Sequence, residues 1–204
     1  NNLITTDVEN LPENEVRAGA LLTPQGKILF DFLVSREADG FTLETDSSQL
    51  DALIRRLTMY KLRAAVEIKP HAQNGVSVFW DGDKPEGAKL DSRFAKAGIE
   101  LYRAAGASAS GAIEPYDALR ISVGIVHSGA DYALQDAFPH DVLMDVNDGV
   151  SFKKGCFVGQ EVVSRMKHRG TARRRVVIVE SDAPLPAGGT DLTVNGKTIG
   201  TLGS

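Results

Sequence analysis

The chain of 204 residues has one cysteine, one tryptophan and no run of eighteen apolar residues. A single cysteine excludes an internal disulfide framework and favours a reducing compartment, and the lack of a long apolar run predicts no membrane-spanning helix. One thiol cannot by itself hold an iron–sulfur cluster, and the four scattered histidines have no zinc-binding spacing. Walker and Rossmann glycine motifs are also missing. We therefore expect no permanently bound metal and no nucleotide-binding loop.

The composition, 42% hydrophobic and 25% charged, is typical of a globular protein with a proper core. The charge is unevenly distributed. Residues 153–175 hold eight Lys or Arg and one acid, Glu161, a net charge of +7, so the rest carries −11 of the total −4. A basic stretch on an acidic body indicates an anionic ligand, a nucleic acid or an acidic partner, with a solvated basic surface as the alternative.

Turn residues and apolar periodicity predict the secondary-structure elements. We expect a turn at 24–26 followed by a strand to Val34, a helix capped by Ser47 with a stripe of leucines, a helix from Pro115 to about Gly124, and a short helix over 159–170. Residues 126–150 have little periodicity and predict a long ordered loop, which often carries function. Further strands are expected at 40–45, 64–68, 75–80, 98–104 and 173–180. The Asn195-Gly196 pair predicts a hairpin with a type I′ turn.

This order predicts an α+β fold with antiparallel pairing. From about Thr171 the pattern becomes all-β and indicates the start of a small barrel. The chain begins without methionine and stops inside a predicted strand, so we expect pieces to be missing at both ends.

The segment KKGCFVGQE, residues 153–161, holds the only cysteine. Cys156 comes just before a predicted helix N-terminus, where exposed N–H groups and nearby lysines favour a thiolate that acts as a nucleophile or metal ligand. Gly155 and Gly159 would let the chain bend and a flat ligand approach, and Gln160 and Glu161 could form hydrogen bonds to the edge of a heterocycle. The alternative is a small buried hydrophobic side chain, the usual role of a free cysteine.

KGCFVGQE resembles the K-G-C-[aromatic]-x-G-Q-E signature of the folate-binding YgfZ-type proteins. These are iron–sulfur-cluster assembly factors of bacteria and mitochondria and relatives of the glycine-cleavage T protein, an aminomethyltransferase. The segments LITTDVENL, LLTPQGKILFDF and YKLRAAVEI resemble the N-terminal half of the family in the expected order. The resemblance thus covers most of the chain.

The resemblance implies a T-protein-like ring of two interwoven α+β portions, one ferredoxin-like, plus a C-terminal β-barrel that is partly truncated here. Residues 1–170 would form the folate-binding region and 171–204 the start of the barrel. Tetrahydrofolate, or a one-carbon derivative, would bind near the central hole, with Cys156 as the catalytic residue. The implied folate-side residues are Asp31, Lys154, Gly155, Cys156, Phe157, Gly159, Gln160, Glu161 and Arg165.

Two departures from the family pattern weaken the prediction of aminomethyl transfer activity. T proteins have a tandem Asp-Asp where this chain has Phe30-Asp31. Where T proteins and some YgfZ-type members have Leu-Arg-x-Glu-x-Gly, this chain places Ser122 at the pterin-facing carboxylate. A serine still forms hydrogen bonds there, but it is not a charged acceptor.

Three functions remain open. The first is a tetrahydrofolate-binding accessory factor for assembly or repair of iron–sulfur clusters, in which Cys156 ligates a cluster transiently or shields one. Its partners would be iron–sulfur scaffold, carrier and client proteins, in the bacterial cytoplasm or the mitochondrial matrix. The second is a folate-dependent aminomethyl or one-carbon transferase with Asp31 as general acid or base. The third, RNA binding through 153–175, has only Phe157 for base stacking.

Overall fold

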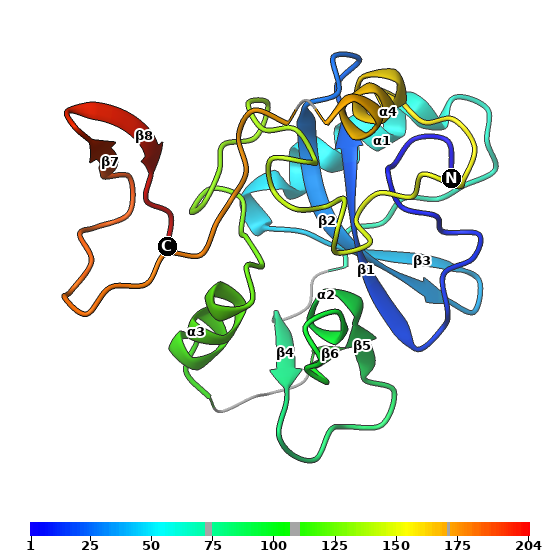
Figure 1. Cartoon of the computed structure of the whole chain (residues 1–204). Helices are drawn as coiled ribbons and strands as arrows, with labels where there is room; N and C mark the ends of the chain where they lie inside the picture. Colours follow the sequence, from blue (N-terminus) through cyan, green and yellow to red (C-terminus); the bar gives the residue numbers. More distant parts are fainter. Residues whose placement is uncertain (72–74, 107–110, 171) are drawn as a thin grey trace.

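The computed structural model describes residues 1–71, 75–106, 111–170 and 172–204. Its main feature is a six-stranded sheet in the order β3-β2-β1-β5-β6-β4 (Figure 1). Pairing is antiparallel except between β1 and β5, which are parallel, so the expectation of purely antiparallel pairing was wrong at this one position. The strands are β1 (Glu15–Leu22), β2 (Ile28–Glu37), β3 (Gly40–Glu44), β4 (Val76–Phe79), β5 (Lys89–Asp91) and β6 (Tyr102–Ala105).

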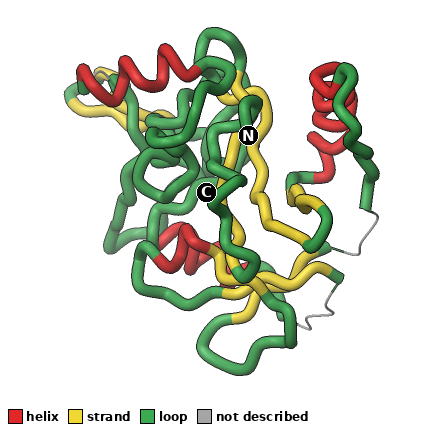
Figure 2. Tube along the Cα trace, turned by 90° about the vertical axis from the view of Figure 1, so that its right-hand side faces the viewer, coloured by secondary structure: helices red, strands yellow, loops and turns green. Residues whose placement is uncertain are grey.

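The helices are short, and loops form much of the chain (Figure 2). They are the 3₁₀ turn η1 (Ser47–Gln49), α1 (Leu50–Lys61), α2 (Ser92–Ala95), α3 (Glu114–Ser122) and α4 (Gln160–Arg169). A separate hairpin of β7 (Asp191–Val194) and β8 (Lys197–Thr201) lies at one end of the molecule, away from the main sheet (Figure 1). Every helix among the described residues is too short or too polar to cross a lipid bilayer.

The two long strands β1 and β2 are buried on both faces. Phe30, Phe32 and Val34 of β2 pack with Leu53 of α1 on one face. On the other face, residues of β1 and Leu33 of β2 pack against the chain segment after residue 125, including Phe157 and, on α4, Val163. Burial on both faces explains why β2 is a nearly continuous apolar run and does not alternate. Strand β2 therefore runs through the centre of the molecule.

Several local predictions are confirmed. Gly26 has a left-handed φ of 82°, and its N–H donates to Thr23 O over 2.9 Å, which closes the predicted turn at 24–26. Asn195 and Gly196 have φ of 53° and 75°, as a type I′ turn requires. Residues 126–150 contain no helix or strand, as expected of a long ordered loop.

Other predictions are wrong. Residues 64–68 and 173–180 form no strand, although both are β-rich. A strand needs a neighbouring ladder, and around 173–180 one backbone bond, from Val176 N to Asp141 O at 2.9 Å, connects the segment to the body. Asp46, not Ser47, caps the helical segment through a bond from Ser48 N. The predicted domain boundary at Thr171 lies outside the described residues.

Candidate functional site

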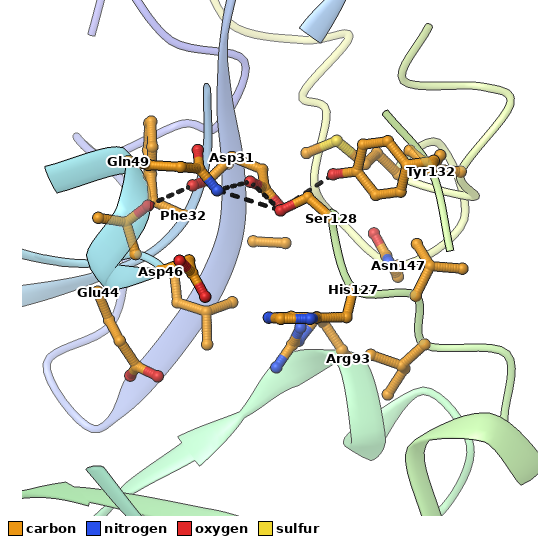
Figure 3. Close-up of a pocket in the computed structure, with 18 of the residues that line it drawn as sticks. Asp31, Phe32, Glu44, Asp46, Gln49, Arg93, His127, Ser128, Tyr132 and Asn147 are labelled. Atoms are coloured by element: carbon orange, nitrogen blue, oxygen red, sulfur yellow. Dashed lines mark hydrogen bonds between the residues drawn. The ribbon is translucent and has the colours of Figure 1, made fainter. Parts of the chain in front are cut away.

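A cavity of about 240 Å³ opens beside the middle of β2 (Figure 3). Its walls come from β1, β2, the end of β3 and the segment up to η1, α2, β6, α3 and the long loop, so chain segments far apart in sequence enclose it. Phe32 and Leu33 give it apolar surface, whereas Asp31 and Ser128 give it polar groups. A concave, mixed apolar and polar site of this kind is the usual place for a small ligand.

Three neutral donors surround the carboxylate of Asp31 (Figure 3). Gln49 Nε2 and Ser128 Oγ donate to Oδ1 over 2.9 Å and 2.8 Å, and Tyr132 OH donates to Oδ2 over 2.9 Å. Burial and the neighbouring Asp31 carboxylate raise the pKa of Tyr132 well above its ordinary value, so its hydroxyl keeps its proton and donates. Asp31 is thus held in one orientation.

An ion network forms another wall of the cavity. Asp91 is fully buried, with its Oδ2 at 2.6 Å from Arg93 Nη2 and 3.5 Å from Arg103 Nη1. Arg103 also pairs with Glu44. Burial alone would raise the pKa of Asp91, but the charge and hydrogen bonds of Arg93, together with the charge of Arg103, outweigh it and hold the pKa below its usual range. Both cavity arginines are therefore neutralised by protein carboxylates.

The signature segment lies around the start of α4. Cys156 is exposed, three residues before Gly159, which precedes the first helical residue. This confirms the prediction of an accessible cysteine just before a helix. The alternative, a buried hydrophobic cysteine, is wrong. Glu161 and Arg165 are exposed on α4, whereas Phe157 is buried in the core.

Lys154 has an anchoring position. Its Nζ donates to the backbone oxygens of Ile4 at 2.6 Å, Thr6 at 3.1 Å and also Asn1, which holds the N-terminal segment in place. Burial lowers the pKa of Lys154 to about 8, although the nearby carboxylates of Asp7 and Glu9 act in the opposite direction. The ammonium group of Lys154 therefore binds backbone oxygens of the protein itself.

Gly159 and Gln160 also make internal contacts. A Cβ on Gly159 would lie 2.6 Å from Thr23 O, so this glycine allows a close approach of protein backbone. Gln160 Oε1 accepts a bond from Phe157 N at 3.3 Å. By contrast, nothing lies within 4 Å of a Cβ built on Gly155.

Of the predicted folate-side residues, only Asp31 lines this cavity. Among the described residues that line it, none comes from the signature segment. The two places share one hydrophobic cluster, however, because Phe157 packs in the same core as Val142 and Met144, which do line the cavity. Ser122 is exposed, and its hydroxyl donates to Leu119 O at 2.8 Å.

Sequence reasoning missed Gln49, Ser128 and Tyr132. Ser128 and Tyr132 belong to the long loop, whose length was a signal of function. No local pattern pointed to Gln49, because its role depends on how η1 lies against β2.

Part of the basic stretch is neutralised within the chain. Arg174 pairs with Asp136 at 3.0 Å, and Arg175 pairs with Asp145 at 3.1 Å. Lys154 is also engaged, and Lys167 Nζ lies 3.5 Å from the centre of the Phe152 ring, so four of the eight Lys and Arg residues bind other parts of the protein. This reduces the charge that a nucleic acid would meet.

The fold is that of the glycine-cleavage aminomethyltransferases. The crystal structure of glycine cleavage system aminomethyltransferase T from Bartonella henselae is similar with a TM-score of 0.62, over 98% of this chain and 66% of that chain. Sequence identity is 16%, so the likeness shows the T-protein-like fold alone. Residues 173–204 match the family model of the CAF17 C-terminal beta-barrel domain. The mixed α+β fold class with a C-terminal barrel domain is thereby confirmed.

In sequence, the chain is similar to mitochondrial iron–sulfur cluster assembly factors. It is 30% identical to iron-sulfur cluster assembly factor IBA57 of Mus musculus over 211 residues and to that of Homo sapiens over 210 residues, in each case 88% of this chain and 59% of the relative. The IBA57 homolog of Mycosarcoma maydis is 31% identical over 86% of this chain and 48% of its own length. The chain thus spans about half to three fifths of these curated relatives.

Proposed function

We propose that this chain acts in iron–sulfur cluster assembly or repair, binds a reduced folate in the cavity beside Asp31 and uses Cys156 at a partner interface. The observation that carries the proposal is the exposed Cys156 before α4, in a chain whose relatives are named iron–sulfur cluster assembly factors. Those relatives are mitochondrial, which supports the mitochondrial matrix if the chain is eukaryotic. The YgfZ-type signature supports the bacterial branch of the same function.

Cys156 would act together with another protein. Within the described ranges, no group of three or more His, Cys, Asp or Glu side chains is placed to hold a metal ion. A cluster that Cys156 ligates would therefore take its remaining ligands from a scaffold, carrier or client protein. Such a thiol must be reachable by a protein surface, and the exposure of Cys156 meets that requirement.

The cavity fits the ring end of a folate. At about 240 Å³ it is smaller than the roughly 300–1,000 Å³ of sites that enclose a drug-sized ligand. It would take the bicyclic pterin ring and leave the p-aminobenzoylglutamate tail outside. Asp31 provides an acceptor for ring N–H groups, and Phe32 provides apolar surface. When bound, the folate would supply a carrier for one-carbon groups.

A complementation assay tests the use of Cys156. Cys156→Ala should abolish rescue of cluster-enzyme activity in a strain that lacks the protein, while Arg169→Gln, an exposed change on α4 outside the signature, should rescue. Full rescue by Cys156→Ala would remove the thiol from the mechanism.

A tetrahydrofolate titration tests the cofactor. Trp80 packs in a cluster with Ile125, which lines the cavity, so its fluorescence should respond to a bound ring. A saturable change is expected for the wild-type chain. A flat signal, together with no heat of binding in calorimetry, would contradict folate binding.

A second candidate, a folate-dependent one-carbon transferase, is favoured by the position of Asp31 in the cavity. Purified protein with tetrahydrofolate and an aminomethyl donor would decide. Turnover that is lost in Asp31→Asn would support the transferase, and no turnover would leave the assembly function.

A further inference from the structure

The Asp31 carboxylate has few acceptor positions left. A carboxylate accepts about four hydrogen bonds, and Gln49, Ser128 and Tyr132 take three of them. Oδ1 accepts two of these bonds, at 2.9 Å and 2.8 Å, whereas Oδ2 accepts one, from Tyr132. As far as the described part of the chain is concerned, one position, on Oδ2, therefore remains for a ligand.

The donors themselves are fixed. Gln49 is 7% exposed, and its Nε2 also donates to Ser128 Oγ at 3.1 Å, so the two side chains brace one another. Tyr132 is connected through its backbone oxygen to Gly129 N at 2.8 Å, which closes the loop between them. The three donors come from η1 and the long loop, and they meet on β2 (Figure 3).

The charges of the cavity disfavour an anion. Asp31, Glu44 and Asp46 all line it. The two arginines that line it are already paired, Arg93 with Asp91 and Arg103 with both Asp91 and Glu44. Glu44 is itself neutralised by Arg103, so Asp31 and Asp46 are the acids left without an arginine partner. Among the described lining residues no guanidinium is uncommitted, so a carboxylate or phosphate placed here would meet these two carboxylates, whereas a ring with N–H groups would meet acceptors. His127 is exposed and lines the cavity together with Asp46, whose pKa is lowered by hydrogen bonds from Ser48 and also by His127 (Figure 3).

We propose that Gln49, Ser128 and Tyr132 are positioning residues that hold Asp31 as a fixed hydrogen-bond acceptor, so that the cavity selects an uncharged or cationic nitrogen heterocycle by its N–H groups. Asp31 then meets the ligand through the acceptor position that is left on Oδ2. This inference rests on the proposed folate function and assigns the ring to the cavity and the anionic tail to the outside.

Three small probes test the ligand class on the full wild-type chain. 6-Methyltetrahydropterin has the ring and its N–H groups without the tail, p-aminobenzoylglutamate is the tail alone, and quinoxaline is a bicyclic ring without N–H groups. We expect calorimetric binding of the pterin and none of the other two. Binding of the tail with no binding of the pterin would overturn the assignment, although folate binding would stand.

Matched variants test the positioning residues. Ser128→Ala and Tyr132→Phe should each weaken binding of 6-methyltetrahydropterin by about five- to tenfold, since each removes one hydrogen bond to the carboxylate. Ser128→Thr keeps the hydroxyl and should retain affinity, a rescue that a purely structural role would not give. Thr58→Ala, which removes an exposed hydroxyl of α1 that donates to Ile54 O at 2.8 Å, is the control and should bind like the wild type.

The outcomes separate the two proposals. Unchanged pterin affinity in both Ser128→Ala and Tyr132→Phe, with native circular dichroism, would overturn the positioning role and leave folate binding intact. If neither tetrahydrofolate nor the pterin binds to the wild-type chain, both the folate function and this inference are overturned. The probe series needs no variant, so a variant that fails to fold does not remove the test.

Discussion

Gly26 and Gly159 lie against each other, with the Cα of Gly26 only 3.0 Å from the position that a Cβ on Gly159 would take. Both have left-handed φ, 82° and 79°, which favours glycine at each position. The contact joins the β1–β2 turn to the start of α4, and so connects the strand that carries Asp31 with the segment that carries Cys156. Within KGCFVGQE, Gly159 therefore lets the backbone at the start of α4 pack closely against the β1–β2 turn.

Gly159→Ala should therefore destabilise the protein by about 2–4 kcal/mol, because the new Cβ combines left-handed strain with a 2.6 Å approach to Thr23 O. Gly155→Ala, where a Cβ meets nothing within 4 Å, is the matched control and should cost much less. Urea unfolding measures both. Equal stabilities of the two variants would show that the contact between the turn and α4 is not needed for folding.

The exposure of Cys156 predicts that the native protein reacts with a chromogenic disulfide without unfolding. Because the chain has one cysteine, the absorbance reports this thiol alone. We expect the native rate to lie within about tenfold of the rate in urea, and Cys156→Ser to change the free energy of unfolding by no more than about 0.5 kcal/mol. A thiol that reacts only after denaturation would contradict the exposed position.

Asp91→Asn should be strongly destabilising. It removes the charge that neutralises Arg93 and Arg103 next to the cavity, and loss of one partner of a buried ion pair costs about 3–5 kcal/mol. Asp148→Asn breaks the pair between Lys96 and Asp148, whose side chains are 53% and 49% exposed, and should cost less than about 1 kcal/mol. The difference between the two free energies of unfolding is the measurement. Similar small values would mean that water reaches the buried pair.

His140 predicts a pH dependence of stability. The side chain is 3% exposed, and neither ring nitrogen has a hydrogen-bond partner among the described residues. Burial, with the positive charges of Arg175 and Lys167, lowers its pKa, while Asp145 and Asp141 act in the opposite direction. The unfolded chain therefore binds the proton more tightly than the folded chain. The stability that the folded protein owes to a neutral His140 is complete above about pH 6.5 and is lost as the pH falls through the folded-state pKa.

The slope of the free energy of unfolding should reach at most about 1.4 kcal/mol per pH unit for this one proton. His140→Phe, which keeps a ring beside Phe152, should flatten that part of the curve between about pH 7 and pH 5. Parallel curves for the wild type and His140→Phe would show that another group causes the loss. Unfolding by urea at a series of pH values gives both curves.

Local patterns predicted the elements whose conformation depends on neighbours in the chain. Gly26 and the Asn195-Gly196 pair adopt the turns expected of them, because few other residues tolerate these backbone angles. Leu53 lies on the predicted apolar stripe and is buried. The same reasoning failed for 173–180, since β-rich composition describes a side-chain preference and cannot supply a neighbouring strand.

The sequence by itself determined the glycine turns and the placement of Cys156 before a helix, because sterics and amphipathic periodicity act over a few residues, and its resemblance to a known family implied the T-protein-like fold. Only the tertiary structure decided that Gln49, Ser128 and Tyr132 meet on Asp31 and that Gly159 packs against Gly26. These partners are separated by 18 to 133 positions along the chain. Their contacts depend on sheet order and loop path, which no local pattern encodes.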